Sequence, residues 1–190
     1  MATPLGHALA GYAVYNFTNA ARGCGDLSLT LLCVFMATAP DLDFLAGLLV
    51  GKPALYHQGI THSLGAALLA SLAAAGVWGL RRRSFLAVFR CCFIAYLSHL
   101  TLDLLGTDKR PPYGIPLLWP ISDVHFVSPV PILLGVRHAA TATTPTREWV
   151  LALLHPHNLA AIAWETIVVL PFIWLGHWHR RVSLDSRGAK

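Results

Sequence analysis

A histidine and an aspartate stand four residues apart in one apolar segment of this chain, as His99 and Asp103. Residues i and i+4 share one face of an α-helix, so the two side chains can point toward one site. An imidazole nitrogen and a carboxylate oxygen are both ligands of divalent metal ions. The pair therefore predicts two ligands of one metal site. The simpler interpretation is an ordinary hydrogen-bonded pair of side chains.

Two more motifs carry residues of the same chemistry. In Pro40-Asp41-Leu42-Asp43 the proline disfavours a regular helical turn, so both carboxylates can point inward, or one can bind metal while the other orients a ligand. His57 and His62 lie five residues apart, just before an apolar segment, and can face the same polar pocket. The alternatives are a helix-breaking loop at the membrane surface for the aspartates and a capped polar loop for the histidines.

His7 near the start of the chain and Glu165 in its last apolar segment complete the set. An Asp, Lys or Arg inside a bilayer costs roughly 2.5–3.5 kcal/mol on insertion scales, so each ionisable residue there points to a function or a partner. For Glu165 the alternative is a pair with Arg137, Arg147 or a histidine. The remaining histidines considered, His125, His138, His177 and His179, are expected at the membrane interface.

These residues lie in a chain whose composition is that of a membrane protein, with 55% hydrophobic and 12% charged residues and a mean hydropathy of +0.57. Five apolar segments are near the ~20 residues that a spanning helix needs. The sequence therefore predicts an all-α polytopic membrane protein, with about four to five transmembrane helices around a buried His/Asp site. The expected spans are residues 4–20, 28–50, 62–80, 85–107 and 158–178.

The first segment contains Gly11, Asn16 and Asn19, so an interfacial helix is the alternative there. Region 108–157 is rich in proline and is expected to be a loop on or re-entering the membrane. Residues 1–180 then form a single membrane domain, and residues 181–190 form a polar tail.

Basic residues favour an orientation and exclude one class of partner. The formal net charge is +5, but Arg81, Arg82, Arg83, Arg180 and Arg181 stand at the ends of apolar segments. This placement is typical of topology signals in a multi-pass protein of the inner (plasma) membrane, and no nucleic-acid partner is expected. With these arginines cytoplasmic, all candidate residues approach the non-cytoplasmic face, some about 6–13 Å below it. Convergence of five segments on one face is the main reason to expect a shared site.

Histidine and carboxylate ligands without thiolates favour zinc, manganese or iron over copper(I), and their number suggests two ions. Such a site activates water for hydrolysis of an ester or phosphoester, with an uncoordinated carboxylate, Asp43 or Glu165, as general base. The sequence thus predicts a hydrolase of a lipid or lipid-linked substrate. A transporter that uses the same residues as a relay for protons or divalent metal is the alternative, and a purely structural metal is the third.

Five motifs in fixed order resemble the YdjM-like family of inner-membrane proteins, which are described as metal-dependent hydrolases. The resemblance covers about residues 5–120. The motifs are His7, Pro40-Asp41-Leu42-Asp43, Gly59-Ile60-Thr61-His62-Ser63, Tyr96-Leu97-Ser98-His99 with Asp103, and Gly114-Ile115-Pro116-Leu117-Leu118-Trp119-Pro120.

The resemblance implies a metal site similar to the zinc clusters of the phospholipase C and S1/P1 nuclease superfamily. The family pattern has Arg where this chain has Gln58, so a phosphate contact from that position is not expected here. Carried over by position, the implied ligands are His7, Asp41, His62, His99 and Asp103, with His57 and Asp43 close to them.

Overall fold

The computed structural model describes residues 1–18, 26–79 and 84–188, and it is helical without a strand in these ranges. Two isolated β-bridges, Gly106 with Leu133 and Ile115 with Phe126, connect the loops. The predicted all-α class is confirmed. The helices are α1 (Pro4–Thr18), α2 (Leu27–Thr38), η2 (Ala39–Leu42), α3 (Asp43–Leu49), η3 (Pro53–Leu55), η4 (Ile60–His62), α4 (Leu64–Gly79), α5 (Phe85–Leu105), α6 (Thr146–Leu153) and α7 (Pro156–Gly188).

Three helical stretches are long and apolar enough to cross a membrane among the described residues: Leu27–Leu49, Phe85–Leu105 and Pro156–Ser183. Leu64–Trp78 is apolar but shorter. The basic turn Arg81–Arg83, used to predict the orientation, lies outside the described residues. The region 108–157 contains the short helix α6, and α7 continues through Arg181 to Gly188.

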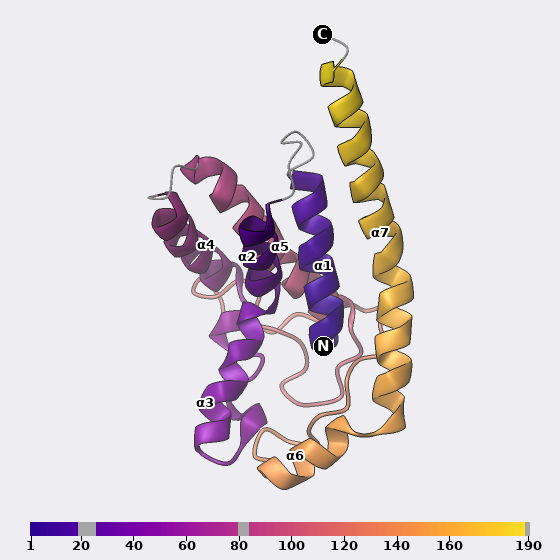
Figure 1. Ribbon diagram of the computed structural model, residues 1–190. Helices are drawn as coiled ribbons and strands as arrows, with labels where there is room; N and C mark the ends of the chain where they lie inside the picture. Colours follow the sequence, from indigo (N-terminus) through magenta and orange to yellow (C-terminus); the bar gives the residue numbers. More distant parts are fainter. Residues whose placement is uncertain (19–25, 80–83, 189–190) are drawn as a thin grey trace.

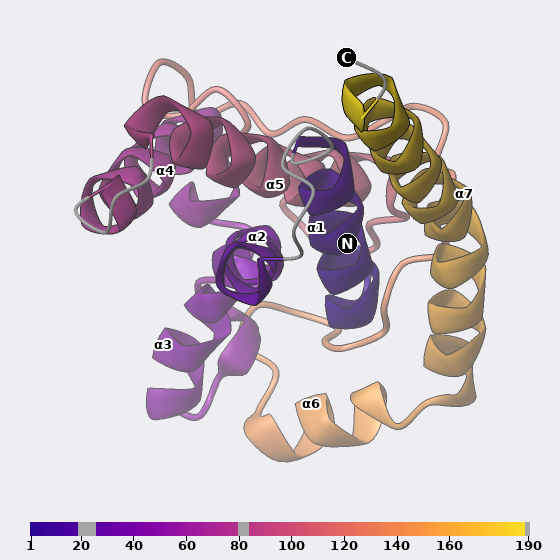
Figure 2. The same cartoon turned by 45° about the horizontal axis from the view of Figure 1, so that its top comes forward.

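Helix α1 is the centre of the bundle, because it packs on α2, α5 and α7, while α4 packs on α5. Figures 1 and 2 show α1 between these helices, with α7 along one side for most of the height of the molecule. The apolar core between them includes Leu29, Cys33, Val88 and Leu100. Large apolar side chains such as Leu31, Phe35 and Trp174 are exposed, as expected of helices that face lipid.

Four helix ends meet at one level of this bundle. Helix α1 begins there, the continuous segment of α2 and η2 ends there, α4 begins after η4, and α5 ends at Leu105. Below that level lie α3, α6 and the loops (Figure 1). Pro40 stands at the first turn of η2, where the chain changes from an α-helix to a 3-10 helix and carries Asp41 and Asp43 past the bundle end. The fold thus places every motif of the sequence at one height.

Gly11 allows α1 and α2 to approach closely. A Cβ atom at Gly11 would lie 2.7 Å from the Cys33 carbonyl oxygen, 2.8 Å from Ala37 Cβ and 2.9 Å from Val34 Cα. Small residues at helix contacts in membranes serve this purpose, because backbones can then pack directly.

Gly11→Ala is expected to destabilise the protein by about 1–3 kcal/mol, because the two helix backbones must separate. Gly76→Ala is the matched control, since a Cβ there meets no atom within 4 Å and alanine favours the helix by up to about 1 kcal/mol. Thermal unfolding of detergent-purified protein, followed by circular dichroism, measures both. Equal unfolding midpoints for the two variants would contradict the close α1–α2 contact.

Candidate metal centre

Four side-chain atoms from three parts of the chain face one point. His62 Nε2 lies 3.6 Å from Asp41 Oδ1 and 3.4 Å from Asp103 Oδ2. His99 Nε2 lies 3.7 Å and 3.3 Å from the same two oxygens. Two ligands held about 2.0–2.2 Å from a tetrahedral ion are themselves about 3.3–3.6 Å apart. The four atoms therefore have the spacing of ligands around one ion.

The same atoms lack hydrogen-bond partners although they are buried. His62, His99 and Asp103 are at most 4% exposed. His62 Nε2, His99 Nε2, Asp103 Oδ2 and both oxygens of Asp41 make no hydrogen bond. Buried polar atoms are nearly always paired, because an unpaired one costs the desolvation free energy of the group. A divalent cation would satisfy all of them at once.

Backbone and side-chain groups fix the orientation of both rings. His99 Nδ1 is 2.8 Å from the Ala37 carbonyl oxygen, so it donates its proton there and leaves Nε2 free as a ligand. His62 Nδ1 is 3.0 Å from Thr61 Oγ1 and 3.3 Å from Asp43 Oδ2. These contacts are the supporting hydrogen bonds that metal-ligating histidines usually make.

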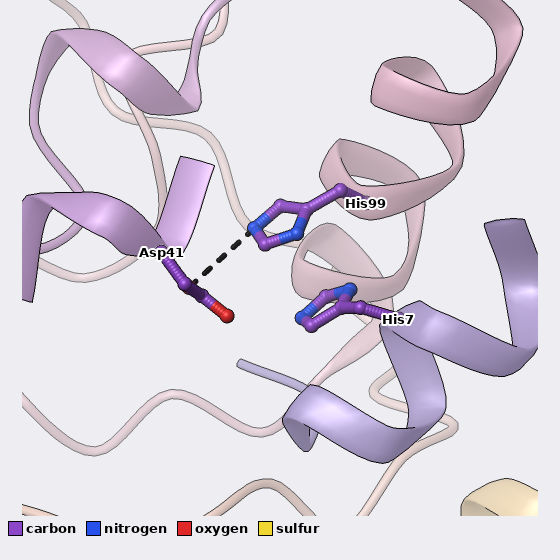
Figure 3. Close-up of side chains that lie close together, drawn as sticks. All are labelled: His7, Asp41 and His99. Atoms are coloured by element: carbon purple, nitrogen blue, oxygen red, sulfur yellow. Dashed lines mark ion pairs between the residues drawn. The ribbon is translucent and has the colours of Figure 1, made fainter. Parts of the chain in front are cut away.

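His7 joins the group from helix α1. Its ring stacks on His99 with the centroids 3.7 Å apart, and its Nε2 is 3.4 Å from Asp103 Oδ1. Figure 3 shows His7, Asp41 and His99 converging from three separate elements. Within the described residues, three overlapping groups of side chains could hold a metal ion. They are His7, Asp41 and His99; Asp41, His57 and His62; and His62, His99 and Asp103.

His57 and Asp43 form a pair beside the centre. His57 Nδ1 is 2.9 Å from Asp43 Oδ1, and the Thr61 hydroxyl donates to Asp43 Oδ2 at 3.0 Å. Burial lowers the pKa of His57, although the hydrogen bond with Asp43 opposes this shift. His57 is therefore held toward the neutral form, which is the form that can bind a metal.

Glu165 lies close to the centre but is absent from all three groups. One of its oxygens, Oε2, accepts hydrogen bonds from the Thr3 backbone amide, at 2.8 Å, and from the Thr3 hydroxyl. The neighbouring amide of Ala2 donates to Asp103 Oδ1 at 2.8 Å. Glu165 thereby connects α7 to the segment that precedes α1 and His7.

Two residues at this site were not foreseen from the sequence. His138 was expected at the interface but is 6% exposed, with its ring 5.4 Å from that of His57. Burial, with His57 and Arg110 nearby, lowers its pKa to about 3. Arg110 is 5% exposed and donates to the backbone oxygens of Ala54 and His57. Both residues stand in loops without helical periodicity, so no spacing rule could associate them with the motifs.

Replacing His62, or His99 together with Asp103, is expected to remove most of the bound metal. Wild-type protein should bind about two equivalents of zinc or manganese, whereas His62→Ala and the double change His99→Ala with Asp103→Ala should lose most of it. Metal content by mass spectrometry on detergent-purified protein measures this. His179→Ala is the control, because this histidine is exposed near the far end of α7. Protein purified without chelators that holds no metal would contradict the assignment.

The chain is similar to known inner membrane proteins. The family model described as YdjM inner membrane protein matches residues 1–182. The inner membrane protein YbcI of Escherichia coli strain K12 is 28% identical over 156 residues, which cover 78% of this chain and 82% of that protein. No solved structure matches the chain. Because the family model extends over nearly all of the described residues, this chain belongs to the YdjM inner membrane protein family.

Proposed function

We propose that this protein is a membrane-bound, metal-dependent hydrolase of a lipid or lipid-linked ester or phosphoester. The observation that carries the proposal is the set of four unpaired, buried donor atoms from Asp41, His62, His99 and Asp103 at ligand spacing. A set of nitrogen and oxygen donors without thiolate suits zinc, with manganese as the second choice. A second ion would be held by one of the other two groups of candidate ligands, His7 with Asp41 and His99, or Asp41 with His57 and His62.

When bound, such ions polarise the scissile ester or phosphoester and make water a better nucleophile near neutral pH. The chain's own residues hold the ions and move protons. The two candidate general bases are Asp43 and Glu165. Asp43 is the better placed, because it contacts both His57 and His62. Glu165 would act on the site through Thr3, as a positioning residue.

The mostly apolar lining of the groove between three helices, among the residues that the structure describes, favours a hydrolase over a transporter. A relay for protons or metal needs ionisable groups that continue across the membrane. The groove between α1, α5 and α7 is instead lined by apolar residues such as Val14, Leu102 and Phe172. The described ionisable residues of the centre are gathered at one end of the bundle. A hydrolase needs access from only that end.

Asp43→Asn is expected to lower kcat at least about 100-fold while metal remains bound, because the amide cannot accept a proton. Asp123→Asn, an exposed residue in a loop, is the matched control and should keep full activity. The assay measures hydrolysis of phospholipids and of a soluble phosphodiester by metal-loaded protein in vesicles.

Two outcomes would overturn the proposal. One is metal-loaded wild-type protein without turnover on the whole panel of lipids and phosphoesters. The other is movement of protons or zinc across the same vesicles, lost in His99→Ala with Asp103→Ala, which would identify a transporter. Activity that Asp43→Asn leaves unchanged would remove Asp43 as the base.

A further inference from the structure

A cavity of about 470 Å³ lies beside the metal centre, between loop residues 107–110, loop residues 134–140 and the junction of α6 with α7. One carboxylate lines it, that of Asp108. The Asp108 oxygens already accept hydrogen bonds from Gln58 Nε2 and from the amides of Arg110 and Gly114. The cationic or imidazole side chains that line the cavity are Lys109, Arg110, Arg137, His138, His155 and His157.

Several of these side chains are able to bind an anion. Arg110 is 5% exposed, and its Nε is buried without a hydrogen-bond partner. An N–H group of arginine can only donate, so this atom needs an acceptor that the described residues do not supply. Lys109 and Arg137 are exposed, and neither forms an ion pair with a described carboxylate. The cavity therefore combines a buried free donor with two cations at its surface.

An apolar groove of about 470 Å³ adjoins this cavity, formed by α1, α5 and α7. Leu105 and Leu133 line the groove, while Thr107 and Leu134 line the cavity. The two chain segments are bonded to each other here, because Leu133 N donates to Leu105 O and Thr107 N donates to Leu133 O, each at 3.0 Å. The groove and the cavity are therefore lined by neighbouring residues of the same two segments.

The cavity also reaches the metal centre. Met1 lines it, and Met1 Sδ lies 2.8 Å from His138 Nε2 and 2.7 Å from His57 Nε2. His57 in turn contacts Asp43 and Asp41. A ligand in the cavity would therefore be separated from the centre by the side chains of Met1 and His57.

We infer that this cavity binds the phosphate of an anionic membrane lipid, with an acyl chain of the same lipid in the adjoining groove. The phosphate would pair with Lys109 and Arg137, and Arg110, which lines the same cavity, would add a third positive charge. A basic cavity alone would suit any phosphate, but the neighbouring apolar groove favours an amphipathic ligand. The inference rests on the proposed function only in naming this lipid as the class of substrate.

The test is lipid binding, measured by native mass spectrometry of protein in a neutral maltoside detergent. Phosphatidylglycerol should bind at least ten-fold tighter than phosphatidylcholine with the same chains. The double change Lys109→Ala with Arg137→Ala should remove this preference. Arg147→Ala is the matched control, because this exposed arginine on α6 does not line the cavity.

Two ligands without acyl chains, glycerol phosphate and inorganic phosphate, distinguish binding of a whole lipid from binding of phosphate alone. Thr101→Trp fills the groove at an exposed position and should weaken phosphatidylglycerol at least ten-fold, while glycerol phosphate, the headgroup without chains, is unaffected. Glycerol phosphate or inorganic phosphate bound as tightly as the lipid would overturn the lipid assignment. So would an unchanged preference in the double variant.

Metal content measured on the same samples separates this inference from the proposed function. Full metal binding without preference for phosphatidylglycerol would overturn the lipid site alone. Preference for this lipid in protein that binds no metal would confirm the lipid site and would overturn the proposed metal-dependent hydrolase function.

Discussion

The burial of several ionisable side chains at one site is the constraint on which the rest of the structure depends. His7, His62 and His99 are fully buried, and Asp103 is 4% exposed. A charged carboxylate in such surroundings is costly unless it is paired or binds a metal. The centre is therefore the part of the molecule that most needs a cation. The exposed apolar side chains of the helices, by contrast, need only lipid as their surroundings.

The fold meets this constraint by using helix ends. Backbone groups at helix ends and in loops are free to make hydrogen bonds that a helix interior cannot offer. The Ala37 carbonyl near the end of α2 orients His99, and the Ala2 amide before α1 binds Asp103. Irregular backbone at this level, including η2 and η4, supplies ligands at angles that continuous helices could not. The loops beneath the bundle then exclude water from the centre.

The basic cavity and the apolar groove extend the same design to a substrate. A membrane lipid has a charged headgroup and a chain that stays in the hydrocarbon region, so its two ends need different surroundings. Arg110 and the neighbouring cations provide one, and the groove between α1, α5 and α7 provides the other. Residues on either side of the Gly106–Leu133 bridge line the groove and the cavity, and the cavity leads through Met1 to His57. The proposed hydrolase would reach a lipid here without withdrawing it fully from the membrane.

Much of this protein follows from its sequence by short-range rules. Apolar runs of membrane length determine the helical class, since only helices satisfy every backbone group within one apolar segment. The i, i+4 rule associates His99 with Asp103, whose facing atoms are 3.3 Å apart. The order of the motifs identifies the family.

Only the tertiary structure decided how the two aspartates of Pro40-Asp41-Leu42-Asp43 divide between the centre and its support. Asp41 faces His62 and His99, while Asp43 holds His57, because the 3-10 turn of η2 sends them in different directions. The tertiary structure also buried His138 and Arg110 and connected Glu165 to Thr3. The contacts of His138, Arg110 and Glu165 join residues more than fifty positions apart, so no local pattern of residue types could specify them.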